Sequence, residues 1–181
     1  MLQDPNGHIV VDDGRRYLER TRDQYDLIVI DPPPPVEAAG SSLLYSREFY
    51  ELAKQRLKPG GILVAWYPGG DLLAARAMTR SLCESFPHVR LFGGVEGYGT
   101  HFLASMEPVE TLSAAELAAR LPERARRDLL EWNPSAEPAA YLRVVVSQEY
   151  PVEKVIHPDP SVRITDDRPY NEYFLLRGKQ L

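Results

Sequence analysis

A carboxylate at the end of an apolar run is the first candidate for chemistry. Leu27–Ile30 is short and rich in β-branched residues, as is typical of a fully buried strand, and it ends at Asp31 and Pro32–Pro35. Ligands of open α/β sheets bind beyond the carboxyl ends of strands. Because prolines hold the preceding residue extended and lack N–H groups, this loop could hold a carboxylate but not cradle a phosphate. A site for a cationic or neutral substrate and a plain rigid surface loop are equally good interpretations.

An Asp-Gly pair near the N-terminus is the second candidate. Asp13 and Gly14 follow an apolar segment, His8–Val11, that is predicted to be a strand. An Asp-Gly pair is most often a hairpin turn. Here the next residues look helical, so the pair would end a strand and open a helix. A carboxylate there could accept a hydrogen bond from a ligand amine, and a glycine lets the backbone come close to a ligand.

The elements that would position these residues alternate along the first half of the chain. Further strands are predicted at Ile62–Trp66, Val89–Phe92 and Thr100–Ser105. Ser46 can cap a helix that stops at the Lys-Pro-Gly-Gly stretch, and Asp71 can cap another that runs to about Ser85. Strands that alternate with helices over such long connections predict an α/β fold with a mostly parallel sheet.

The regular alternation of strands and helices stops after residue 106, and we expect two regions, 1–106 and 107–181. The latter is predicted to be a helical appendage with a C-terminal strand that packs on the same domain. Ser113 and Glu116 form a capping box before one helix, and Pro122 opens another. A strand is possible at 142–146. A turn with solvated carboxylates is expected at 166–169, and the last strand is expected at 172–176.

Composition excludes several classes of protein. The chain has 181 residues, a net charge of -5 and a pI near 5.4, which does not favour a nucleic-acid partner. One cysteine excludes an internal disulfide, and no cluster of cysteines and histidines has the spacing of a metal site. No apolar run approaches the ~20 residues that span a bilayer, and no signal peptide precedes the first strand. We therefore expect a cytoplasmic chain without a metal.

These segments together resemble the spermidine synthase family, the polyamine aminopropyltransferases. The stretch IVVDDGRRYL resembles that family's third-strand segment, and the resemblance implies that Asp13 and Gly14 contact the adenine of decarboxylated S-adenosylmethionine. The stretch from YDLIVID to KPGG resembles the family's substrate loop, with Asp31 in the place of the catalytic aspartate. The end, ITDDRPYNEYFLLR, resembles spermidine-synthase-like domains fused to bacterial membrane-transporter-like segments, so association with a membrane partner is implied. The implied fold is the Rossmann-like class I methyltransferase fold.

The chain also departs from the family pattern. The family's second loop aspartate falls at Pro34; Glu37 is a candidate substitute, and Tyr98 a candidate for the family's substrate-binding tyrosine. No glycine-rich turn follows a strand and opens a helix, so the first two strands and the cofactor loop are expected to be missing. The sheet order of that fold is 3-2-1-4-5-7-6. Leu27–Ile30 would then be an exposed edge unless His8–Val11 moves across, a homodimer forms, or an upstream polypeptide completes the sheet.

The resemblance implies aminopropyl transfer to an amine such as putrescine, without a metal. Asp31 would bind the ammonium group and accept its proton. Because the cofactor loop is expected to be missing, the isolated chain is expected to be partial or inactive. Two alternatives stay open: a methyltransferase that uses S-adenosylmethionine, and a non-catalytic subunit that a partner completes.

Overall fold

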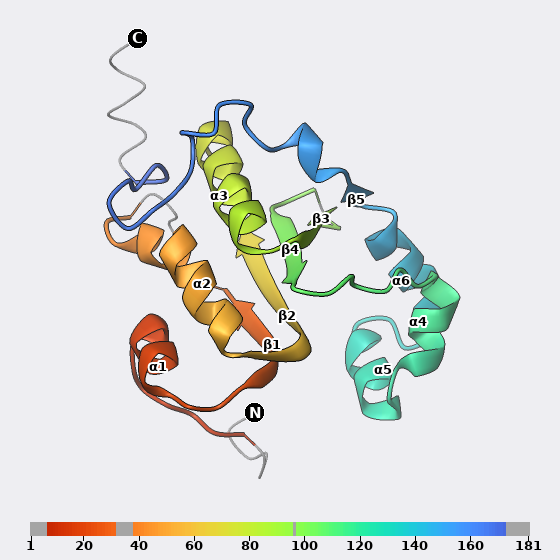
Figure 1. Ribbon diagram of the computed structural model, residues 1–181. Coiled ribbons are helices and arrows are strands. Elements are labelled where there is room, and N and C mark those ends of the chain that lie inside the picture. The colour runs from red at the N-terminus through yellow and green to blue at the C-terminus, as the bar shows by residue number, and fades with distance from the viewer. Residues whose placement is uncertain (1–6, 32–37, 96, 173–181) are drawn as a thin grey trace.

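The computed structural model describes residues 7–31, 38–95 and 97–172, which form a five-stranded sheet with helices on its two sides (Figure 1). The strand order is β1-β2-β4-β3-β5. The strands are β1 (Tyr25–Ile30), β2 (Leu57–Tyr67), β3 (His88–Gly93), β4 (Thr100–Ser105) and β5 (Glu149–Tyr150). The predicted strands between residues 27 and 105 are therefore present.

The sheet is mixed, which corrects the expectation of a mostly parallel sheet. Only β1 and β2 are parallel, with Ile30 opposite Ala65, whereas the pairs β2–β4, β4–β3 and β3–β5 are antiparallel. The order β1-β2-β4-β3 corresponds to the 4-5-7-6 part of the methyltransferase fold. Most parallel pairs of that fold lie among strands 3, 2, 1 and 4. The described residues contain only the last of these four, so the parallel part of the sheet is reduced to one pair.

The segment His8–Val11 is not a strand, contrary to the prediction. Its residues lie on the surface, and Val11 is 98% exposed. A strand needs a neighbour for its backbone groups, and no described residue before β1 supplies one. β1 is consequently an edge of the sheet, with Leu27 53% and Val29 60% exposed. The prediction that this apolar strand becomes an exposed edge is confirmed.

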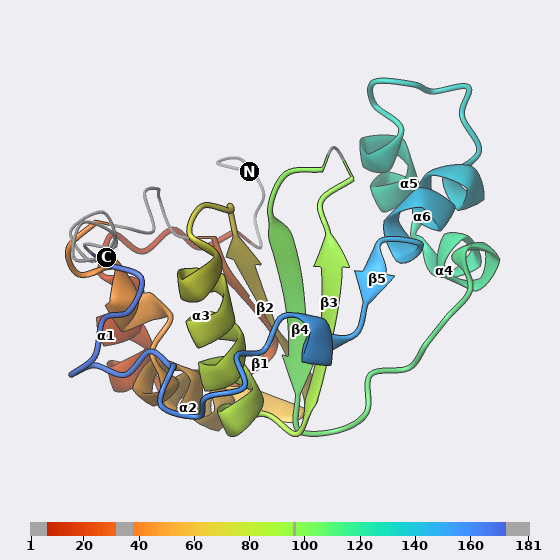
Figure 2. The same cartoon turned by 90° about the horizontal axis from the view of Figure 1, so that it is seen from above.

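Three helices lie on one side of the sheet, as Figures 1 and 2 show. They are α1 (Gly14–Arg20), α2 (Arg47–Gln55) and α3 (Leu72–Ser85), and the 3₁₀ helix η1 (Ser41–Leu44) precedes α2. Ser46 and Asp71 cap α2 and α3 by accepting hydrogen bonds from backbone N–H groups, as predicted. The helices and the sheet enclose a core of fully buried side chains that includes Tyr50, Leu63, Met78, Leu82 and Phe102.

A second group of helices lies on the other side of the sheet, beyond β3 and β5 (Figure 2). It comprises α4 (Ala114–Arg120), α5 (Glu123–Leu129) and α6 (Pro138–Val146). Ser113 and Glu116 form the predicted capping box of α4. Residues 142–146, predicted as a possible strand, belong to α6 instead. Pro138 opens this helix, and the helix packs on α4, so tertiary contact overrides the β preference of Val144–Val146.

The chain then returns along α3 to the first group of helices (Figures 1 and 2). A short 3₁₀ helix, η2 (Val152–Lys154), is followed by irregular chain and by a tight turn in which Thr165 pairs with Arg168. The last predicted strand lies outside the described residues except for Glu172. Among the described helices, none has the length and apolar character needed to cross a bilayer.

Candidate functional site

Asp31 lies directly after β1, exposed at the carboxyl end of the strand. It lines a pocket of about 280 Å³ that opens at the edge of the sheet, which we call the strand-end pocket. The walls of the pocket come from three elements: Gly14, Tyr17 and Leu18 of α1, residues 28–31 at the end of β1, and Leu44 and Phe49 of η1 and α2. Pro32–Pro35 and Glu37 lie outside the described residues, so their predicted roles are not tested.

Gly14 lines the other side of this pocket, where α1 begins, and Asp13 precedes it as the N-cap of the helix. The Asp13 carboxylate caps the helix by accepting a hydrogen bond from the Arg16 N–H at 2.9 Å. A carboxylate has acceptor capacity beyond one hydrogen bond, so the cap does not exclude a ligand. A Cβ atom built on Gly14 would meet nothing within 4 Å, which leaves the backbone open to close approach. The pair therefore opens a helix as predicted, although no strand precedes it.

Tyr98 lies on the loop between β3 and β4 and is 65% exposed. Its ring packs on Trp66, with ring centroids 6.1 Å apart and an interplanar angle of 57°. Trp66 follows Ala65, the parallel partner of Ile30, so the indole and Asp31 occupy equivalent positions at the ends of adjacent strands. The sequence prediction missed Trp66, although its place at the end of a predicted strand was a usable signal.

A polar cluster joins α1 to the segment before α2, and the sequence prediction missed it too. The Arg15 guanidinium donates two hydrogen bonds to the Asp166 carboxylate, at 2.8 and 2.6 Å. Ser46 Oγ donates to the same carboxylate at 2.6 Å. The hydrogen bonds from Arg15 hold the pKa of Asp166 below its ordinary value, against partial desolvation. The expected turn is present, but Asp166 is not a solvated carboxylate.

The residues just after this turn also bind the segment before α2. Glu172 is buried and accepts a hydrogen bond from the Ser42 N–H at 3.0 Å. Asn171 is buried as well, and its side-chain amide donates to Ser41 Oγ at 2.8 Å. These contacts place the C-terminal segment directly behind the wall of the pocket that η1 and α2 provide.

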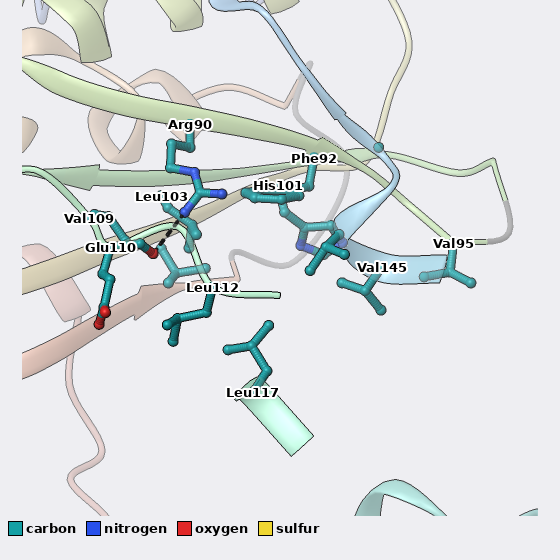
Figure 3. A pocket seen from close by; sticks show the side chains of 13 residues that line it. Arg90, Phe92, Val95, His101, Leu103, Val109, Glu110, Leu112, Leu117 and Val145 are labelled. Carbon is teal, nitrogen blue, oxygen red and sulfur yellow. Dashed lines mark hydrogen bonds between the residues drawn. The ribbon is translucent and has the colours of Figure 1, made fainter. Parts of the chain in front are cut away.

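A second, more apolar pocket of about 460 Å³ lies between the sheet and the α4–α6 group (Figure 3). Figure 3 shows Leu112, Leu117 and Val145 facing the strands across it. Arg90 at its rim is already held by Glu149, through two hydrogen bonds of 2.7 Å. None of the predicted site residues lines this pocket, so its apolar character does not make it the candidate active site.

The described residues offer no metal site, because they contain no group of three or more His, Cys, Asp or Glu side chains that could hold an ion. Cys83 lies on α3 and is mostly buried, and this burial raises the pKa of its thiol to about 11. The thiol is therefore protonated at neutral pH and is a poor nucleophile. Among the residues that line the pocket at the end of β1, Asp31 supplies the carboxylate.

Comparison with known proteins identifies the family. Residues 1–89 match the family model described as "Spermine/spermidine synthase domain", and this segment carries Asp13, Gly14 and Asp31. The first 89 residues are therefore part of a spermine/spermidine synthase domain. The resemblance drawn from the sequence is thereby confirmed.

Curated relatives of the family match over longer parts of the chain. The "Polyamine aminopropyltransferase 2" of Pseudomonas aeruginosa is 34% identical over 94 residues, which are 50% of this chain and 27% of the relative. The protein of the same name from Hyperthermus butylicus is 32% identical over 132 residues, 67% of this chain and 42% of the relative. The chain thus spans well under half the length of these relatives.

A solved structure supports the same fold. The spermidine synthase of Thermotoga maritima matches with a TM-score of 0.50 and 25% identity, over 60% of this chain and 38% of that protein. The methyltransferase-like fold expected from the sequence is therefore confirmed for the part that the chain contains. More than half of that relative lies outside the match.

Proposed function

We propose that this chain contributes the amine side of an aminopropyltransferase site. The observation that carries the proposal is the pocket at the carboxyl end of β1, which Asp31 and Gly14 line together. In this chemistry an amine such as putrescine takes an aminopropyl group from decarboxylated S-adenosylmethionine. The relatives named aminopropyltransferases support this choice of reaction.

Asp31 is the proposed catalytic residue. A primary amine has a pKa of about 10, so it arrives as an ammonium ion and must lose a proton before it attacks. In the attack, the amine nitrogen bonds to the methylene carbon beside the sulfonium sulfur, the C–S bond breaks, and its electron pair stays on sulfur as a thioether. Asp31 binds the ammonium and accepts the proton, which then passes to water. The exposure of Asp31 at the pocket mouth supports both roles.

The adenine of the co-substrate is assigned to Asp13 and Gly14. The open space beside Gly14 and the remaining acceptor capacity of Asp13 fit an adenine with its exocyclic amine. Contacts to the sugar and the aminopropyl tail have to come from outside the described residues. One hydrogen-bonding site contributes only about 0.5–1.5 kcal/mol, whereas micromolar affinity needs about 8 kcal/mol, so the chain alone should bind the co-substrate weakly.

The amine chain is assigned to Trp66, on the strand next to β1, to Tyr98 and to Glu37. Tyr98 and Trp66 pack together near the end of β2, where an aromatic surface can hold methylene groups and attract a cation. Glu37 is proposed as the second anionic contact, in place of the aspartate that Pro34 replaces. A diamine would then lie between two carboxylates and an aromatic wall.

We further propose that another polypeptide segment completes the sheet at β1. The exposed Leu27 and Val29 and the unpaired backbone of an edge strand support this proposal. An upstream polypeptide that carries a glycine-rich cofactor loop would complete both the sheet and the site, and in its absence a homodimer would cover the edge. The complete assembly would act in the cytoplasm, alone or beside a transporter-like membrane segment.

Calorimetric titration tests the proposed co-substrate. The chain, produced together with the proposed upstream polypeptide, is titrated with decarboxylated S-adenosylmethionine and with S-adenosylmethionine. Tighter binding of the decarboxylated form supports aminopropyl transfer. Binding of the carboxylated form alone would favour the methyltransferase alternative, and binding of neither by a folded sample would favour a non-catalytic subunit.

A further inference from the structure

The C-terminal segment 164–172 touches both walls of the strand-end pocket without lining it. We propose that this segment is a clamp that fixes the distance between the two walls, and that Arg15 and Asp166 are its positioning residues. The inference rests on the proposed function, because the clamped pocket is the proposed aminopropyl-transfer site.

Several contacts of the clamp lie on the elements whose residues line the pocket. Arg15 follows Gly14 in α1, and its guanidinium also donates to the carbonyl oxygen of Leu43 at 3.1 Å, beside the wall residue Leu44. On the opposite wall, Ser46 Oγ donates to Asp166 and accepts a hydrogen bond from the Phe49 N–H at 3.2 Å. The Asp166 carboxylate therefore joins the first turn of α1 to the first turn of α2.

The clamp is anchored in the core, so it can resist movement of the walls. Ser81 Oγ of α3 is 2.8 Å from both the N–H and the carbonyl oxygen of Ile164, and Ile164 is fully buried. The same carbonyl oxygen accepts a hydrogen bond from the Arg47 N–H at 3.0 Å. Two residues further along the chain, the Asp166 N–H donates to Glu48 at 3.0 Å. The segment is thus fixed to α3 on one side and to α2 on the other.

The chemistry of the Arg15–Asp166 pair suits a positioning role. A paired, two-bond contact between guanidinium and carboxylate fixes orientation as well as distance, which lysine cannot reproduce. The Arg15 side chain is 18% and the Asp166 side chain 32% exposed, so water screens the pair only in part. Group transfer is sensitive to displacements of about 1 Å between reacting groups, so walls that move apart would slow the reaction without removing any reacting group.

Hydrogen exchange on the 181-residue chain tests the clamp. Two amides are informative. The Phe49 N–H donates to Ser46 Oγ, and the Tyr17 N–H donates to the carbonyl oxygen of Asp13. Arg15→Lys alters only α1, yet we expect it to speed exchange at Phe49, across the pocket, by about tenfold, the loss typical of a charged hydrogen bond. Asp166→Asn should speed exchange at both amides, while the β2–β4 amides stay protected and show that the fold persists.

Two further variants separate a clamp from an ordinary stabilising contact. Glu84→Gln removes an ion pair with Arg163, at 3.3 Å, which is the residue just before the segment, and we expect the exchange at Phe49 to stay unchanged. The exchanged pair Arg15→Asp with Asp166→Arg restores the charge complementarity and should recover most of the protection at Phe49. Unchanged exchange at Phe49 in Arg15→Lys, an equal effect of Glu84→Gln, or no recovery in the exchanged pair would overturn the clamp.

The same measurements distinguish failure of the clamp from failure of the proposed function. Asp31→Asn should leave Phe49 as protected as in the wild type, because Asp31 takes no part in the clamp. If the clamp variants behave as expected but calorimetry detects neither co-substrate, the pocket is clamped and the proposed reaction is wrong. If a co-substrate binds and the clamp variants leave exchange and affinity unchanged, the site stands and the clamp is wrong.

Discussion

The exposed edge of the sheet should make the isolated chain associate with itself, and Val29→Lys should weaken that association. Val29 is 60% and Leu27 53% exposed on β1, and within the described part of the chain the backbone groups on the outer side of this strand have no partner strand. A lysine at an edge strand is a common protection against edge-to-edge pairing. Because the Val29 side chain is mostly in solvent, the substitution itself should change the free energy of unfolding by no more than about 0.5 kcal/mol.

The size of the effect follows from the exposed fractions. Full burial of a valine or leucine contributes about 1.5–3 kcal/mol, and just over half of each side chain is still uncovered. Covering both residues on two copies would thus contribute roughly 4 kcal/mol, about half of it from the two copies of Val29. Loss of roughly 2 kcal/mol weakens the dissociation constant by about thirtyfold.

Sedimentation equilibrium over a range of concentrations measures this constant. Leu72→Lys is the matched control, since Leu72 is also 60% exposed but lies at the start of α3. We expect Val29→Lys to shift the chain toward the monomer and Leu72→Lys to behave as the wild type. A wild type that is monomeric at every concentration, or a Val29→Lys variant that associates equally well, would refute the reasoning.

Three further outcomes are expected. Asp31→Asn should lower aminopropyl transfer by the completed protein by about 10²–10⁴-fold, with an unchanged melting temperature because Asp31 is exposed; unchanged turnover would remove it from the mechanism. Arg15 lowers the pKa of Asp166 below its ordinary value of 3.8, so the pair stabilises the fold above that pH and less as pH falls through the lowered pKa. The difference in unfolding free energy between wild type and Asp166→Asn should therefore be full at pH 6 and shrink in acid, and a difference that grows in acid would contradict this. Gly99→Ala should destabilise more than Gly97→Ala in urea unfolding, because both glycines have φ near +75° but only at Gly99 would a Cβ meet Trp66 Nε1, at 2.5 Å; equal losses would argue against that contact.

Local signals in the sequence predicted local structure well. The caps at Ser46, Asp71 and Ser113 are present, since each cap depends on a residue and the N–H groups two or three positions later. The same locality misled the prediction at Val144–Val146, where β-branched residues suggested a strand. There the Pro138 start and packing on α4 decide the outcome, and neither packing partner nor register is visible in a single segment.

Contacts between distant residues could not be predicted. Arg15 and Asp166 are 151 positions apart, and nothing local in the turn distinguishes a paired carboxylate from a solvated one. The segment His8–Val11 shows the converse: its pattern is that of a strand, but a strand also needs a neighbour that the described residues do not provide. Asp31 and Gly14, in contrast, were predicted separately and line one pocket, because the end of β1 and the start of α1 both contribute to its walls.

The most direct test of the account is an aminopropyl-transfer assay on two samples, with putrescine and decarboxylated S-adenosylmethionine as substrates and mass spectrometry of the product. One sample is the 181-residue chain, and the other is the chain produced together with the proposed upstream polypeptide. We predict spermidine from the second sample only, since the amine side of the site is present in both but the cofactor loop is supplied only there. Spermidine formation at an enzyme-like rate by the isolated chain, running as a monomer, would contradict the account.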